Sequence, residues 1–407
     1  MKRNLLLLTL PLLILLWGCR SGEISYEKTE PAVADSEGDV MRGENGGGEE
    51  GENTQEYAGR VTAGEWNDLN NWMFWSNLMT NSQADQEGTD YTGYSDYWGL
   101  YTNNRVKVKA VDADGNPLYD AQIRLETADG NVIWTARTDN QGGADLWVGL
   151  TQPTNETNSS NWVLVLNNKI QNTDVKITHW GEEVQINELT DTEVDTSLPK
   201  QLDVAFIVDA TGSMADEINF LKADLENIIA EVENHKTTTK IRTAALFYRD
   251  EGDDYLTRVS DFSERLSATT QFISNQSADG GGDFPEAVHT ALEVGLQKLA
   301  WNEDKGMRIA FMLLDAPPHK EDKVIASLQK SIPLYAAKGI RIIPVAASGV
   351  DKPTEFFLRF TAIATDGTYV FLTNDSGVGN EHIQATVGEY KVELLRDLMV
   401  RLIEQYM

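Results

Sequence analysis

The sequence predicts an α/β protein: a C-terminal doubly wound, mostly parallel sheet, preceded by a small all-β sandwich and a disordered N-terminal tether. Three observations lead to this prediction. Over residues 201–407, apolar runs typical of buried strands alternate with amphipathic segments typical of helices. Over 104–186, short stretches of alternating polar and apolar residues are separated by turn residues. Residues 19–56 are acidic, rich in glycine and poor in large apolar side chains.

The charge of the chain limits the kinds of partner that it can bind. The 407 residues suffice for two or three domains, and 34 basic against 64 acidic side chains give a formal net charge of −30. A chain with this charge repels nucleic acids and anionic lipids. We therefore predict no nucleic-acid partner, and contact with a membrane only through a lipid anchor.

The amino terminus predicts export. Residues 1–18 combine a basic start with an apolar stretch from Leu5 to Trp17, which is shorter than the roughly 20 residues needed to span a bilayer, as in a signal peptide. The sequence Leu-Trp-Gly-Cys that ends at Cys19 resembles a bacterial lipobox, which implies lipidation of Cys19. An uncleaved membrane anchor and a signal peptide with an incidental cysteine are the alternatives. Cys19 is the only cysteine, so the chain has no internal disulfide.

The tether follows directly. Residues 19–56 cannot bury enough apolar surface to offset their conformational entropy, so we predict a disordered, self-repelling segment. The segment resembles the acidic tracts of surface-exposed Bacteroidetes lipoproteins. The resemblance implies a lipid-anchored protein of the bacterial cell envelope, in the outer membrane and exposed at the surface.

Residues 57–103 are crowded with aromatic side chains. Leu69, Trp72, Trp75 and Met79 recur at helical spacing. Aromatic rings at this spacing usually pack on a neighbouring domain, so we predict a helical or irregular segment that does so. A platform for carbohydrate is the alternative.

Residues 104–186 predict the sandwich. The stretches Val106–Val111 and Ala121–Glu126 alternate in polarity on either side of turn residues. The run Val106–Val148 resembles the carboxypeptidase regulatory-like, transthyretin-like sandwich, which implies a spacer without chemistry of its own. A calcium site is the alternative reading of three turn carboxylates: Asp112, Asp114 and Asp139.

A polar linker, 187–200, precedes the α/β part. There the apolar run from Phe206 leads into Asp209-Ala-Thr211-Gly-Ser213, and an amphipathic helix is predicted from Ala215 to about Glu233. A carboxylate and two hydroxyls at the carboxyl end of a strand are hard oxygen donors, which suit Mg²⁺ or Ca²⁺.

Two further aspartates are predicted at the same edge of the sheet. Asp283 lies in a glycine-rich loop, before a helix expected over Pro285–Trp301, and Asp315 ends an apolar strand. Because the carboxyl ends of parallel strands share one edge, these donors can meet. Asp250, which also follows a strand, competes with Asp283. The predicted metal ligands are Asp209, Thr211, Ser213, Asp283 and Asp315.

This set of residues resembles the metal-ion-dependent adhesion site of von Willebrand factor type A domains. The resemblance covers about residues 201–407, and Asp-Ala-Thr-Gly-Ser-Met carries it most clearly. It implies a Rossmann-like fold that holds a divalent metal, Mg²⁺ first, with Mn²⁺ or Ca²⁺ as alternatives. It also implies a protein ligand that offers an acidic group to the metal.

The motifs favour binding over catalysis. The sequence has no nucleophile elbow, phosphate-binding loop or zinc-binding helix, so we predict no enzyme. His289 and His319 lie near the predicted loops and leave a metal-dependent hydrolase as the least favoured reading. A structural envelope protein that works without metal is the main alternative.

Overall fold

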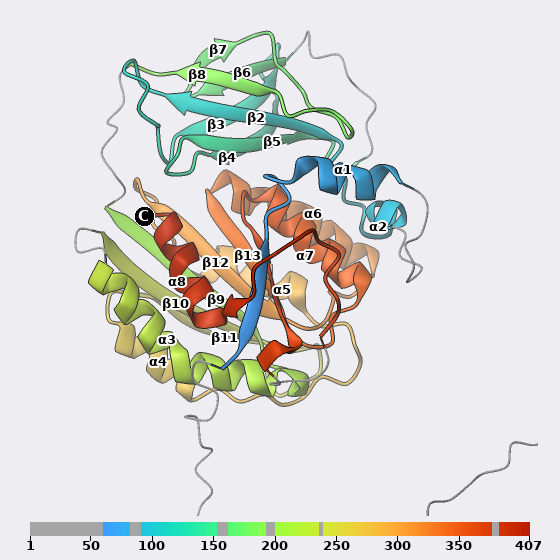
Figure 1. The fold of residues 1–407 in the computed structure, drawn as a ribbon, viewed down its shortest axis with the longest axis vertical. Helices are drawn as coiled ribbons and strands as arrows, with labels where there is room; N and C mark the ends of the chain where they lie inside the picture. The colour runs from blue at the N-terminus through green and yellow to red at the C-terminus, as the bar shows by residue number, and fades with distance from the viewer. Residues whose placement is uncertain (1–59, 82–90, 153–161, 193–199, 236–238, 377–381) are drawn as a thin grey trace, which may run out of the picture. The chain divides into compact units, whose positions relative to one another are not determined.

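The computed structural model describes residues 60–81, 91–152, 162–192, 200–235, 239–376 and 382–407 (Figure 1). The predicted signal peptide, the lipidation of Cys19 and the tether lie outside these residues and stay predictions. No helix in the described ranges is long and apolar enough to cross a membrane.

A large sheet forms the centre of the α/β part. Five of its strands run parallel, and they are β10 (Lys240–Tyr248), β9 (Gln201–Asp209), β12 (Met307–Leu314), β13 (Ile340–Ala346) and β14 (Tyr369–Leu372), in that order across the sheet. Residues 307–314 of β12 are buried throughout, because helices cover both faces of the sheet. The predicted α/β fold is confirmed at this level.

The edges of the sheet are antiparallel. On one side, β11 (Thr257–Ser263) pairs with β10. On the other, β1 (Thr62–Trp66) pairs with β14, and β15 (Glu393–Leu394) pairs with β1. The sheet is therefore mixed, and a strand from the aromatic-rich segment belongs to it.

Helices cover both faces of the sheet (Figure 1). Phe206 and Val208 pack toward α3 (Ala215–His235), α4 (Leu266–Ser274) and α8 (Leu395–Gln405). Ala205 and Ile207 face the other way, toward three helices that follow later strands: α5 (Val288–Lys298), α6 (Asp322–Ala337) and α7 (Lys352–Ala364). Alternate residues of β9 thus serve two cores, as the strand period of two requires.

Pro333 lies inside α6. Two short 3₁₀ turns complete the set, η3 (Gly212–Met214) and η4 (Asn374–Ser376).

The aromatic-rich segment also forms two helices, α1 (Trp72–Thr80) and α2 (Tyr91–Trp98). Trp75 stacks on Phe356 of α7 with ring centroids 5.7 Å apart, and Trp98 lies 5.4 Å from Phe357. Both tryptophans are fully buried. The rings pack between helices, where they contribute apolar burial.

Two small sheets form the sandwich. One contains β5 (Gly143–Val148), β2 (Asn104–Val111) and β8 (Ile186–Thr190), and the other contains β4 (Val132–Arg137), β3 (Gln122–Thr127), β6 (Trp162–Leu166) and β7 (Lys169–Asn172). All pairs are antiparallel except β2 with β8. The last strand thus runs past the predicted end at residue 186. Likeness to the transthyretin-like sandwich stays a prediction.

Buried polar contacts join the sandwich to the α/β part. Arg308 at the start of β12 forms an ion pair of 3.0 Å with Asp120 of the sandwich. Arg341 of β13 donates a hydrogen bond of 3.2 Å to the backbone oxygen of Arg137. These two contacts lie at the amino ends of β12 and β13, away from the carboxyl ends that carry the predicted metal ligands.

Candidate metal centre

The loop after β9 folds around the carboxylate of Asp209. The backbone N–H and the hydroxyl of Thr211 both donate to Oδ1 of Asp209, at 2.9 and 2.7 Å. Asp209 is 0% exposed. An aspartate that accepts from the residue two positions later turns the chain out of the strand, which explains locally why β9 ends here.

The other oxygen of Asp209 is the unusual feature. Among the described residues, Oδ2 of Asp209 is buried without a hydrogen-bond partner, and so is Oδ1 of Asp315. Burial, and then the charge of Asp315, raises the pKa of Asp209 to about 7, although the two bonds from Thr211 and the nearby hydroxyl of Tyr248 lower it. The two buried carboxylates destabilise each other's charged form.

Ser213 completes this group on the solvent side. Burial raises the pKa of Asp315, and the neighbouring Ser213 hydroxyl lowers it in part. Ser213 is exposed, whereas Asp209, Thr211 and Asp315 are buried. The structure thus brings four of the five predicted ligands together at one edge of the sheet, with one side open.

Asp283, the fifth predicted ligand, does not share the burial of Asp209 and Asp315. It is exposed, and its carboxyl has no hydrogen bond or ion pair with any residue in the part of the chain that the structure describes. Its competitor Asp250 is buried and accepts a contact of 2.7 Å with Nε2 of His319. The structure therefore leaves open which of these two side chains belongs to the site.

Glu286 is a carboxylate that the sequence interpretation missed. It is 3% exposed, and its Oε2 lacks a hydrogen-bond partner among the described residues. Burial, and then the charge of Asp209, raises its pKa to about 9. The backbone N–H of Glu286 donates to the backbone oxygen of Pro317 at 2.8 Å, which holds Glu286 beside the loop that carries Asp315. The sequence places Glu286 between a glycine-rich loop and a helix, where a metal ligand is expected, but Asp283 in the same loop was chosen as that ligand.

The position of Glu286 also corrects the predicted helix. The sequence predicts a helix from Pro285, but α5 begins at Val288. Glu286 instead forms a short parallel bridge with Pro318. The bridge takes the backbone of Glu286 out of helical geometry and places its side chain in the cluster.

The glycine-rich loop packs closely on this group. Gly212 N donates to the oxygen of Gly280 at 3.2 Å. Gly281 has φ +71°, and a Cβ there would lie 2.9 Å from Oε1 of Glu286 and 3.0 Å from Cβ of Thr211. Only glycine combines this backbone angle with so close an approach.

The donor set fits a hard cation that binds partly through hydroxyls. In the described ranges, no three Asp, Glu, His or Cys side chains are arranged to hold one ion. A metal here would depend on two carboxylates and two hydroxyls, from Asp209, Asp315, Thr211 and Ser213. Oxygen donors of this kind suit Mg²⁺, which keeps several water ligands. The two unpartnered buried oxygens are the observation that fits a bound cation.

One family model matches part of the α/β region. Residues 203–347 match the model of the von Willebrand factor A domain. The match spans all five predicted ligands, Asp283 included, and it supports a von Willebrand factor A domain over this stretch.

One relative is known from a virus. An ariadne-like RING finger protein of Acanthamoeba polyphaga mimivirus is 30% identical over 214 residues, which cover 49% of this chain and 20% of that protein. The chain thus spans about a fifth of the length of the relative it matches.

Proposed function

We propose that this chain is a cell-envelope lipoprotein that binds a protein ligand through a divalent metal, Mg²⁺ first, held at the carboxyl edge of the large sheet. Asp209, Thr211, Ser213 and Asp315 hold the metal. The match to the von Willebrand factor A domain supports a protein-interaction or adhesion-type function. The anchor is the lipid on Cys19, which supports an outer-membrane, surface-exposed location.

The observation that carries the proposal is the pair of unpartnered buried oxygens, Oδ2 of Asp209 and Oδ1 of Asp315. A buried polar atom without a partner costs about 1–3 kcal/mol, and more when it is charged. A cation held by these residues would offset this cost and reduce the repulsion between the two carboxylates. When bound, the metal supplies a positive centre that accepts an acidic group of the ligand. The exposed hydroxyl of Ser213 marks the side from which that group approaches.

The third acidic ligand has two candidates. Asp283 is the predicted one, and it is exposed at the rim. Glu286 is buried beside Thr211, and its own carboxyl oxygen lacks a partner in the described part of the chain. Asp250 is less suitable, because it is engaged with His319.

Metal binding is tested by titration calorimetry with Mg²⁺ on the chain from Tyr57 onward. We expect the wild-type protein to bind and Asp209→Ala to lose at least about tenfold in affinity, equal to about 1.4 kcal/mol. Asp209→Asn keeps an acceptor for Thr211, so it tests the charge without removing the turn. Asp279→Ala is the matched control. It removes an exposed aspartate beside the glycine-rich loop that carries Asp283, and it should bind Mg²⁺ as the wild type does. Asp283→Ala and Glu286→Gln then identify the third ligand. Equal Mg²⁺ uptake by wild type and both Asp209 variants would rule out the site.

The second part of this experiment separates binding from a structural role. A protein partner captured by the wild-type chain in Mg²⁺ should be released by EDTA and should not be captured by Asp209→Asn. A structural envelope protein that works without metal would retain its partner under both conditions. Turnover of an ester, phosphate or glycan that needs both metal and Asp209 would instead favour the hydrolase.

A further inference from the structure

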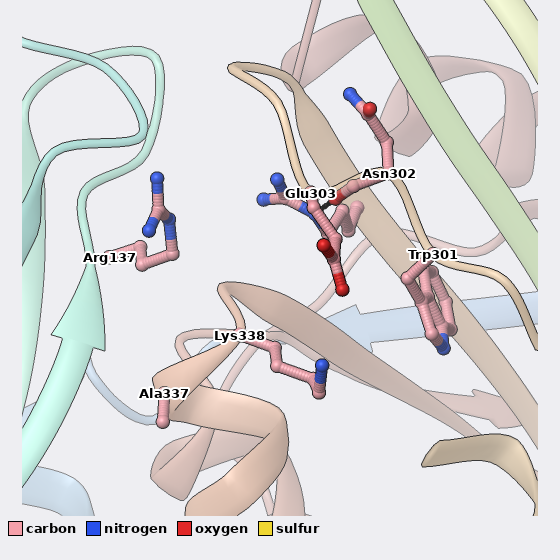
Figure 2. Close-up of a pocket in the computed structure, with 7 residues that line it drawn as sticks. Arg137, Trp301, Asn302, Glu303, Ala337 and Lys338 are labelled. Carbon is pink, nitrogen blue, oxygen red and sulfur yellow. Dashed lines mark hydrogen bonds between the residues drawn. The ribbon is translucent and has the colours of Figure 1, made fainter. Parts of the chain in front are cut away.

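A pocket lies at the junction of the sandwich and the α/β part. It has a volume of about 180 Å³. Arg137 reaches it from the end of β4 and Lys338 from the residue after α6 (Figure 2). Arg308, near the start of β12, also lines it. Arg308 is the second residue of β12, the strand that Asp315 follows. The pocket and the candidate metal centre therefore lie at opposite ends of β12.

The pocket concentrates positive charge in a chain whose net charge is −30. Arg137 and Arg308 share one buried carboxylate, because Nε of Arg137 and Nη1 of Arg308 donate to the same oxygen of Asp120, at 2.6 and 3.0 Å. One carboxylate cannot balance two guanidinium groups. Lys338 adds a third positive charge, and Glu303, exposed at the opening, adds one negative charge.

Two donors at this pocket are available to a ligand. In the part of the chain that the structure describes, Nη1 of Arg137 and Nζ of Lys338 have no hydrogen-bond or ion-pair partner. Arg308 is different, because its three nitrogens all donate to Asp120 or to backbone oxygens of the loop 302–306. Arg308 therefore contributes charge, while Arg137 and Lys338 contribute free donors.

The remaining contacts hold Arg137 in place. Its Nη2 donates to the backbone oxygen of Asp120 at 2.7 Å, and its own backbone oxygen accepts from Arg341. Its side chain also lies against Gly339, where a Cβ would come within 2.9 Å of Cβ of Arg137. A guanidinium fixed on two sides, with one nitrogen free, is oriented before any ligand arrives, which lowers the entropy cost of binding.

We propose that this pocket binds a small oxyanion, a phosphate group before a carboxylate. Guanidinium and ammonium groups form charge-assisted hydrogen bonds with both kinds of oxyanion, and Arg forks match phosphate geometry well. The three cations exceed the two carboxylates by one charge, which favours the more highly charged phosphate over acetate. Arg137 belongs to the sandwich and Lys338 to the α/β part, so the anion joins the two parts of the chain. It therefore stabilises their contact when it binds.

The test is titration of the full chain with inorganic phosphate, and in parallel with acetate, followed by calorimetry and by thermal unfolding. We expect saturable phosphate binding, weaker acetate binding, and a midpoint of unfolding that rises with phosphate at constant ionic strength. Lys338→Gln should weaken phosphate binding about three- to fivefold, the effect of one partly exposed charge pair. Glu303→Gln should strengthen it by a similar factor, because it removes the negative charge at the opening.

Lys330→Gln is the matched control. Lys330 is an exposed lysine of α6, the helix that Lys338 follows, and it does not line the pocket, so its removal changes the net charge equally and should leave phosphate binding unchanged. Opposite effects of Lys338→Gln and Glu303→Gln cannot arise from unfolding alone. No saturable binding by the wild-type chain, or equal loss in the Lys338 and Lys330 variants, overturns the proposal. Acetate binding as tight as phosphate binding overturns the preference for the dianion.

Discussion

Asp366 shows how a single buried carboxyl group affects stability. It follows α7 with φ 56° and lines a cavity of about 170 Å³ between the sandwich and the α/β part. Its Oδ2 accepts from the N–H of Asp145 at 3.3 Å, while Oδ1 is buried without a partner among the described residues. Burial, and then the charge of Asp145, raises the pKa of Asp366 to about 7.

We expect Asp366→Asn to stabilise the protein at neutral pH and to lose this advantage in acid. A carboxyl group with a raised pKa binds its proton more tightly in the folded state, so its contribution is fully present below the unfolded pKa, near 4, and is lost as the pH rises toward 7. Asparagine keeps an acceptor for Asp145 and tolerates the positive φ. The gain over wild type should grow by roughly 1–2 kcal/mol between about pH 4 and about pH 8.

Urea unfolding of both proteins at several pH values measures this difference. Asp114→Asn changes an exposed aspartate of a sandwich turn and serves as the control. Its difference from wild type should stay nearly constant with pH. A constant difference for Asp366→Asn as well would show that the Asp366 carboxyl is not desolvated in the folded protein.

At the scale of elements, one buried ion pair ties the start of the aromatic-rich segment to α7. Both oxygens of Asp68 accept from Arg359, at 2.9 and 2.6 Å, and both side chains are buried. Asp68 also accepts from Nε1 of Trp66 at 3.0 Å. The guanidinium of Arg359 lies 5.0 Å from the ring centre of Trp75, so the pair is enclosed by aromatic side chains.

Asp68→Ala should therefore cost about 3–5 kcal/mol, because it leaves the charge of Arg359 buried without its main partner. Denaturant unfolding measures the loss. Asp96→Ala, which removes an aspartate bonded to Tyr101 on the exposed side of α2, should change stability by less than about 1 kcal/mol. A small effect of Asp68→Ala would mean that water reaches Arg359, and that α1 and α2 pack more loosely on α7.

At the scale of the whole molecule, the α/β part depends on residues that precede the sandwich. Strand β1 lies between β14 and β15, and its Ala63 is fully buried in the core shared by α3 and α8. The sandwich is thus inserted between one strand and the rest of the sheet. The domain boundary that the sequence predicts at residue 201 would place β1 in a different domain from β14 and β15, the strands with which it pairs.

We expect a fragment of residues 201–407 to be much less stable than a fragment of residues 57–407. Without β1, the edge of β14 loses its hydrogen bonds and the apolar side chains beneath it are exposed. Thermal unfolding and limited proteolysis of the two fragments compare them directly. Addition of β1 as a separate peptide should partly restore the shorter fragment. Equal unfolding midpoints for both fragments would contradict a structural role for β1.

Local sequence patterns were enough to predict the part of the site that follows β9. Asp209, Thr211 and Ser213 were predictable because a strand, a turn and a helix within a few residues fix their relation, and Asp315 followed from the rule that parallel strands end at one edge. Contacts between distant parts of the chain became visible only in the folded structure. Glu286 enters the cluster through a bridge to Pro318, β1 joins a sheet whose other strands lie far along the chain, and Arg137 of the sandwich lines the same pocket as Lys338. Such contacts depend on which surfaces pack together, and the local patterns of a chain do not encode that choice.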